Sequence, residues 1–191
     1  AFQGFDISIK TLQCPSDPAS PKTQTVAGNA QGAHGNYAAC SGNTTYNVSN
    51  ASGFNLNGMF YGSSATRFAD VTDGLTNTIM LGEVIVVADT TQHDVRGRYH
   101  NAVHGGIIFS TLNPPNTSVG DAINGNYCVP LPKAPCANGS AQFVNYGRSY
   151  HSDGMNAALG DGSVRFLRNT INAQTYRDLS TRAGGETLAN Y

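Results

Sequence analysis

The sequence predicts a mainly β protein, built as an antiparallel sheet or sandwich, with one short helix near the C-terminus. Glycine accounts for 22 of the 191 residues, and Asn, Ser and Thr are abundant, which is typical of short strands joined by many turns. An Asp161-Gly162 turn separates two apolar segments, 155–159 and 164–167, and this is the signature of a β-hairpin. Apolar residues at helical spacing follow within 169–182.

Three further segments have the pattern of strands. Residues 5–12 alternate apolar and polar side chains over a full strand length. β-Branched residues dominate 79–87, and another apolar run occupies 106–112 before a Pro-rich breaker. We therefore expect a strand in each, and we expect the C-terminal helix to stop at Gly184-Gly185.

Length and composition bound the architecture and the partners. We expect residues 14–191 to form a single β-rich domain and residues 1–13 an N-terminal strand or assembly arm. Charged residues make up 12% of the chain and the net charge is -1, which excludes a basic surface for nucleic acid. The longest apolar run, 79–88, contains Glu83 and is shorter than the ~18 residues of a membrane span, so none is expected.

The four cysteines indicate an oxidising, extracellular compartment. Their even number, without a CxxC pair, favours two disulfides, and we prefer Cys14–Cys40 and Cys128–Cys136 because each pair is local in sequence. The alternative is a metal site. Four histidines could contribute ligands to it, although no spacing matches a zinc pattern: His93, His100, His104 and His151.

Glycosylation is a second expectation of an extracellular chain. Asn-x-Ser/Thr sequons begin at Asn43, Asn47, Asn50, Asn116 and Asn138, each in a turn-rich stretch. A chain rich in Asn, Ser and Thr produces such sequons by chance, and only the cluster over 43–52 exceeds that level.

The sequence offers residue types for catalysis but not their setting. His151 and Asp161 could form a dyad, yet no nucleophile elbow is present for a serine, and Ser163 lies in the hairpin turn. We expect His151 to bind backbone groups of the adjoining turn. Glu83 lies within an apolar strand, and we expect it to form a structural ion pair with Arg96 or Arg98.

Calcium is the cofactor alternative. Oxygen-rich turns at Asp70, Asp73, Asp153 and Asp161 could supply hard ligands, although no EF-hand loop is present. We expect no metal and no other cofactor.

Several of these segments in order resemble one family, the pilin-like secreted proteins abundant in planctomycetes. His151, nine residues and then Asp161-Gly162 match its H-x9-DG signature, Cys14-Pro15-Ser16-Asp17 matches its Cys-Pro-Ser-Asp element, and 73–83 matches its Asp-Gly-x-x-Asn-Thr-Ile-x-x-Gly-Glu element. The resemblance runs from about residue 11 to 187. It implies a pilin-like globular head. The resemblance does not extend to the prepilin-type N-terminal helix that is typical of the family, so we do not expect assembly through a packed helical core.

The absence of an assembled catalytic pattern favours a structural function over an enzyme. We expect an extracellular filament or surface subunit that carries glycans and self-associates head to tail, with residues 1–12 adding to the sheet edge of a neighbouring copy. The alternative is a pseudopilin-like or glycan-binding secreted module, with calcium as a candidate ligand.

Overall fold

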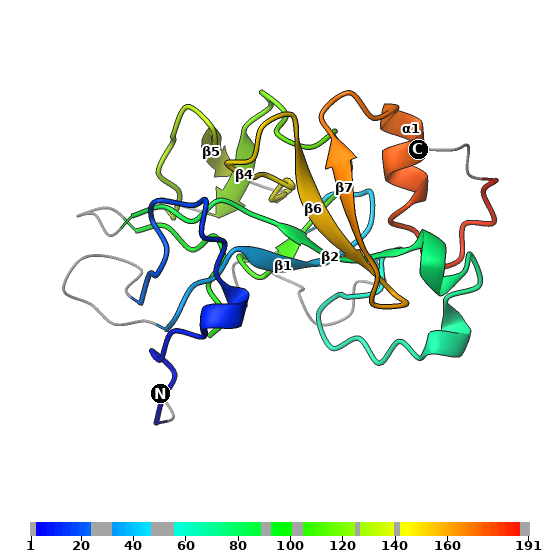
Figure 1. Cartoon of the computed structure of the whole chain (residues 1–191), viewed down its shortest axis with the longest axis horizontal. Helices are drawn as coiled ribbons and strands as arrows, with labels where there is room; N and C mark the ends of the chain where they lie inside the picture. Colours follow the sequence, from blue (N-terminus) through cyan, green and yellow to red (C-terminus); the bar gives the residue numbers. More distant parts are fainter. Residues whose placement is uncertain are drawn as a thin grey trace.

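A computed structural model describes residues 3–23, 32–46, 56–88, 93–100, 105–124, 127–139 and 142–187. Within these ranges the protein is mainly β, as predicted, with one short α-helix (Figure 1). No helix in this part of the chain is both long and apolar enough to cross a bilayer.

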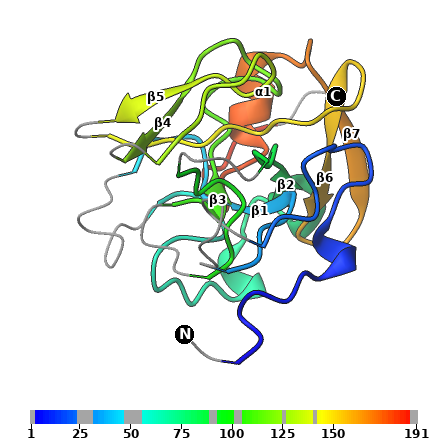
Figure 2. The same cartoon turned by 90° about the vertical axis from the view of Figure 1, so that its left-hand side faces the viewer.

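A five-stranded sheet in the order β3-β1-β2-β6-β7 forms the centre of the molecule (Figures 1 and 2). Its strands are β1 (Tyr37–Cys40), β2 (Ile79–Glu83), β3 (Ile108–Phe109), β6 (Gly154–Leu159) and β7 (Val164–Arg168). The expected sheet is antiparallel, but β1 and β3 pair in parallel, so the observed sheet is mixed. A second sheet contains only β4 (Asp121–Asn124) and β5 (Cys136–Gly139), which also pair in parallel.

The predicted hairpin is confirmed. β6 and β7 pair in an antiparallel register that sets Asn156 opposite Phe166, and Gly162 adopts a φ of 85° in the turn between them. Such a backbone angle favours glycine, which explains the Asp-Gly sequence. The signal is local, because turn chemistry and the flanking strands lie within a few residues of each other.

The main core lies between the sheet and the helix. Ile79, Phe109, Met155, Leu159 and Tyr176 are all buried there. Gly82 on β2 is part of this packing, because a Cβ at that position would come 2.5 Å from the Phe109 ring and 2.7 Å from the Met155 methyl group. Because Gly82 has no side chain, Phe109 and Met155 can pack against the sheet at this position.

The helix α1 spans Ala173–Asp178 and is shorter than the predicted 169–182. Asn172 begins it by accepting hydrogen bonds from the backbone N–H groups of Gln174 and Thr175. Hydroxyl groups end it, because Ser180 and Thr181 donate to the last free carbonyls before Gly184 is reached.

The strand expected over 5–12 is wrong. Residues 3–6 form turns, and a 3-10 turn follows at Lys10–Leu12. Ile7 and Ile9 are 66% and 53% exposed, so the alternating pattern does not face a core in this molecule. Alternation predicts a strand only where a neighbouring strand is available to pair with it.

The strands expected over 79–87 and 106–112 are present but shorter. Val84 to Val87 stay buried without continuing the ladder of β2. Their backbone donors are satisfied elsewhere, since Val84 N–H donates to the Asn36 carbonyl and Val86 N–H donates to the Asp17 carboxylate. Two further 3-10 turns, Phe68–Asp70 and Leu75–Asn77, precede β2.

Candidate functional site

Three side chains from distant segments meet beside the end of β2, and we call them the Cys14–His151 cluster: Cys14, Glu83 and His151. The Nε2 atom of His151 lies 3.1 Å from Oε1 of Glu83 and 3.5 Å from Sγ of Cys14. Glu83 is buried and the His151 side chain is 30% exposed. The cluster therefore reaches the surface on its histidine side.

Neighbouring backbone groups fix the position of two members. The backbone N–H of Asn156 donates to Oε2 of Glu83 at 2.6 Å, and the N–H of Cys14 donates to Oδ1 of Asn36 at 2.9 Å. Asn36 is held in turn by the carboxylate of Asp17 at 2.6 Å. Hydrogen bonds from outside the cluster therefore hold the Glu83 carboxylate and the backbone of Cys14 in place.

Cysteine, histidine and glutamate are also the residue types of a nucleophilic triad, but this arrangement does not form one. In a triad one imidazole nitrogen contacts the nucleophile and the other contacts the acid, whereas here Nε2 contacts both. Burial raises the pKa of the Cys14 thiol, hydrogen bonds involving Ser16 oppose that shift, and the Glu83 carboxylate adds to it. The hollow beside the cluster leaves no room for a water molecule. These features do not favour covalent catalysis.

His151 and Asp161 do not form the dyad considered for the sequence. The Asp161 carboxylate accepts hydrogen bonds from the N–H and hydroxyl of Ser163, within the hairpin turn, and these bonds lower its pKa. The expected contact of the His151 side chain with turn backbone is also replaced, since its Nε2 faces Glu83 and Cys14. The Asp-Gly half of the signature thus shapes the hairpin, and the histidine half belongs to the cluster.

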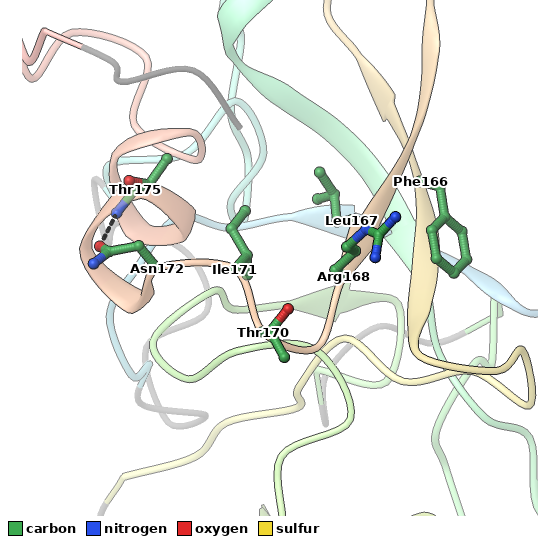
Figure 3. Close-up of a pocket in the computed structure, with 7 residues that line it drawn as sticks. All are labelled: Phe166, Leu167, Arg168, Thr170, Ile171, Asn172 and Thr175. Carbon is green, nitrogen blue, oxygen red and sulfur yellow. Dashed lines mark hydrogen bonds between the residues drawn. The ribbon is translucent and has the colours of Figure 1, made fainter.

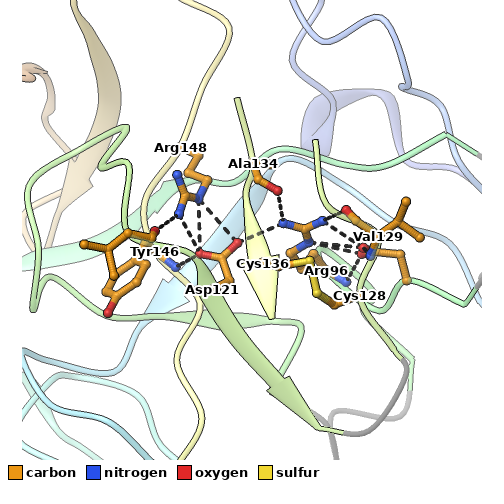
Figure 4. The surroundings of a disulfide bond; sticks show 10 residues. Arg96, Asp121, Cys128, Val129, Ala134, Cys136, Tyr146 and Arg148 are labelled. Carbon is orange, nitrogen blue, oxygen red and sulfur yellow. Dashed lines mark hydrogen bonds and ion pairs between the residues drawn. A yellow bond between two sulfur atoms is a disulfide. The ribbon is translucent and has the colours of Figure 1, made fainter. Parts of the chain in front are cut away.

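The predicted ion pair of Glu83 with Arg96 or Arg98 is wrong. Arg96 belongs to a second buried group, the Arg96–Asp121 cluster: Asp94, Arg96, Asp121 and Arg148 (Figure 4). Arg96 lies 2.8 Å from Asp94 and 2.9 Å from Asp121, and Arg148 lies 3.0 Å from Asp121. Two positive and two negative side chains balance there.

Backbone carbonyls complete the hydrogen bonding of this second cluster. Arg96 donates to Val129 and Ala134, and Arg148 donates to Thr117 and Val119. Desolvated charges that are both paired and hydrogen-bonded are typical of a structural element rather than of a binding site.

One of the two expected disulfides is confirmed. Cys128 and Cys136 are bonded and close the loop whose carbonyls face Arg96 (Figure 4). The Cys14–Cys40 pairing is wrong, because both cysteines are free and buried. Cys40 packs in the main core on β1, where burial raises its pKa to about 12, while Cys14 faces His151. Proximity in sequence does not bring these two sulfurs together.

Comparison with known proteins gives a family. A model described as "Protein of unknown function (DUF1559)" matches residues 1–174. The chain belongs to the DUF1559 family. Neither the curated proteins nor the solved structures give a match. The family has no assigned activity, so the function of this DUF1559 protein has to be argued from its own residues.

The aspartates considered for calcium serve separate turns in this DUF1559 protein. Asp70 pairs with Arg67, and the Asp73 carboxylate accepts from the backbone N–H groups of Gly184 and Gly185. Asp153 occupies a turn with a φ of 62° before β6. Among the described residues, the group whose acidic, histidine and cysteine ligand atoms converge is the Cys14–His151 cluster. The candidate oxygen ligands for calcium therefore do not gather in the described part of the chain.

The predicted glycosylation sites divide into three groups. Asn43 donates from Nδ2 to the Arg177 carbonyl at 3.4 Å, and Asn116 donates from Nδ2 to the Gly154 carbonyl at 3.2 Å, so the amide nitrogen that carries an N-linked glycan is engaged at both. Asn138 lies on β5. Asn47 and Asn50 lie outside the described residues, as does His104 among the histidines considered for metal. At Asn43 and Asn116 the hydrogen bonds favour a structural role.

Neither the Arg96–Asp121 cluster nor the role of Cys14 was predicted. The sequence holds one weak signal for the cluster, because Asp121 directly precedes the apolar pair Ala122-Ile123. For the role of Cys14 the sequence gives only an indirect signal. Glu83 is expected to be buried and therefore to need a partner, but the sequence does not show that this partner is His151, which Cys14 also contacts.

Proposed function

We propose that this protein is a structural subunit that self-associates through an open edge of its sheet into an extracellular filament or surface assembly. The observation that carries the proposal is the state of β7. It is the terminal strand of the sheet, and Val164 and Phe166 on it are 66% and 47% exposed. Exposed, apolar strand edges are the usual template for strand addition.

The ladder between β6 and β7 leaves alternate backbone groups pointing outward. Leu159 N–H donates to the Ser163 carbonyl and Asn169 N–H donates to the Asp153 carbonyl, so the odd-numbered residues of β7 pair with β6. In an antiparallel ladder the intervening residues, Val164, Phe166 and Arg168, then direct their N–H and C=O groups to the free edge. The Arg168 carbonyl already accepts from the Ile171 N–H. The groups that can bind a further strand are therefore those of Val164 and Phe166 and the Arg168 N–H.

A groove beside this edge offers room for side chains of an added strand. It has a volume of about 400 Å³ and runs from β7 to the start of α1 (Figure 3). Its lining combines apolar and polar side chains, among them Phe166, Ile171, Asn172 and Thr175. Strand addition uses backbone hydrogen bonds for affinity and such grooves for specificity.

The occupant that we propose is residues 5–12 of a second copy. Ile7 and Ile9 are exposed and would lie on one face of an extended strand, where they match the face that carries Val164 and Phe166. Asp6 and Lys10 would then lie on the opposite face, where the Asp6 carboxylate can pair with Arg165 of β7. Because donor segment and acceptor edge are different surfaces, the contact propagates instead of closing.

The disulfide supports the extracellular part of the proposal. Cys128–Cys136 is stable in an oxidising compartment and rare in the cytosol. Asn47, Asn50 and Asn138 remain predicted glycan acceptors.

Sedimentation velocity over a concentration series, with electron microscopy of the same samples, tests this function. The parent protein is expected to form concentration-dependent oligomers or fibres. Val164→Pro removes one outward N–H without removing a bond to β6, and Ile9→Asp places a charge in the donor segment, so both are expected to reduce assembly at least tenfold. Phe68→Asp is the matched control, since Phe68 is 69% exposed and belongs to a 3-10 turn, not to β7 or the donor segment.

Two results would contradict the proposal. One is a parent protein that stays monomeric at every concentration, which is the behaviour of a pseudopilin-like or glycan-binding module. The other is assembly that survives Val164→Pro and Ile9→Asp but is lost in Phe68→Asp.

A further inference from the structure

The Cys14–His151 cluster brings three metal-ligating side chains to one place. One ring nitrogen, Nε2 of His151, faces both the Glu83 carboxylate and the Cys14 sulfur. Imidazole nitrogen, thiolate sulfur and carboxylate oxygen are the ligand atoms that zinc takes in proteins. Their convergence from distant segments of the chain is the observation that points to a cation.

The distances fit a tetrahedral ion. Zinc binds nitrogen and oxygen at about 2.0–2.2 Å and sulfur at about 2.3 Å, which places neighbouring ligand atoms roughly 3.3–3.8 Å apart. The two measured separations are 3.1 Å and 3.5 Å, and all three ligand atoms lie within 4.8 Å of one another. Sub-ångström to one-ångström side-chain shifts therefore suffice to complete the geometry.

The charges also match. A thiolate and a carboxylate together carry two negative charges, which a divalent cation neutralises, and the neutral imidazole adds none. Such balance matters because Glu83 and Cys14 are buried, at 1% and 5% exposure. Binding requires the thiol proton to leave to solvent, and a coordinating thiol is deprotonated by the ion itself.

The surroundings provide an outer shell. The backbone N–H of Asn156 holds the Glu83 carboxylate, as second-shell partners do in metal sites, and the Asn36 side chain holds the backbone of Cys14. The His151 side chain is partly exposed, so the cluster reaches solvent on that side. Three protein ligands are one fewer than a closed structural zinc site has.

We propose that Cys14, Glu83 and His151 bind Zn²⁺. Sulfur and imidazole select a borderline-soft ion over calcium, which takes six to eight oxygen ligands in proteins. The site is independent of the β7 edge, so it can fail while the proposed function holds.

Cobalt substitution gives the sharpest test. The protein is purified without reductant, so that Cys128–Cys136 stays bonded, and one equivalent of Co²⁺ is added. We expect a sulfur-to-cobalt charge-transfer band together with the visible bands of tetrahedral cobalt, and we expect Zn²⁺ to displace both. Isothermal titration with Zn²⁺ alone is expected to give one site per chain.

Variants assign the ligands. Cys14→Ser is expected to abolish the charge-transfer band, and Glu83→Gln and His151→Gln to weaken zinc binding at least tenfold. Cys40→Ala, which removes the other free thiol, is the matched control and is expected to keep the band.

The parent protein alone decides the outcome if a variant fails to fold. Absence of a thiolate–cobalt band in the folded parent protein would overturn the proposal, and so would a band that persists in folded Cys14→Ser or disappears in folded Cys40→Ala.

Discussion

The two edges of the central sheet differ in how they end. At the β3 edge, Ser110 pairs with Tyr146, and Ala122 pairs with Val144, so irregular chain continues from the sheet to β4 and β5. At the β7 edge, the backbone groups of Val164 and Phe166 point outward, and a groove lies beside Phe166. One edge is therefore used in folding, and the other has the features of a contact surface.

The charged side chains at the two edges also differ, because those near the β3 edge are buried and those on β7 are exposed. The Arg96–Asp121 cluster lies beside the covered edge, where Asp121 begins β4 and accepts from the backbone N–H of Tyr146. β7 carries its charges on the surface. Substitutions at the covered edge should therefore affect folding, and substitutions at the open edge should affect assembly.

The largest expected effect comes from breaking the Arg96–Asp121 cluster. Asp121→Asn leaves two buried guanidinium groups with one carboxylate, and removing one partner of a buried pair costs about 3–5 kcal/mol of unfolding free energy. Chemical denaturation measures this loss. Asp70→Asn, which breaks the exposed Arg67 pair, is the control and is expected to unfold like the parent. Equal stabilities of both variants would contradict the structural role of the cluster.

Opening the disulfide should have a smaller effect on the same region. Cys128 and Cys136 are eight positions apart, and closing so short a loop stabilises the fold by about 2–3 kcal/mol. We expect Cys128→Ser/Cys136→Ser to lower the melting temperature and to loosen the loop that faces Arg96. A melting temperature identical to that of the oxidised parent would show that the Arg96 contacts alone hold the loop.

Acid should lower the free energy of unfolding through the titration of His34. Burial lowers the pKa of His34 from 6.5 to about 3, with Lys22 adding to the shift and Asp94 opposing it. Between these two pKa values His34 is protonated in the unfolded chain and neutral in the folded protein. Its contribution to the free energy of unfolding is therefore fully present above pH 6.5 and is lost as the pH drops toward 3.

The size of this effect at pH 5 is about 2 kcal/mol, since each pH unit below the unfolded pKa contributes about 1.4 kcal/mol. Denaturation at pH 7 and pH 5 measures it, and His34→Gln is expected to lose this part of the pH dependence. An unchanged difference between the two pH values in His34→Gln would exclude His34 as its source.

How much could be predicted depends on the range of each interaction. The β6–β7 hairpin and the Cys128–Cys136 bridge follow from sequence because turn chemistry and short loops are local. The parallel pairing of β1 with β3, the contact of Cys14 with His151 and the partners of Arg96 join residues far apart in the chain. Glu83 illustrates the difference. Its burial was predictable from the apolar segment around it, whereas the identity of its partner depends on how β6 and the residues before it lie against β2.

Hydrogen exchange of the β7 backbone tests the central claim most directly. In the monomer we expect Arg165 and Leu167 to be protected by β6 and the amides of Val164, Phe166 and Arg168 to exchange freely. In assembled material we expect those three amides to become protected as well. If they exchange at the monomer rate in assembled material, the chain does not associate through this edge.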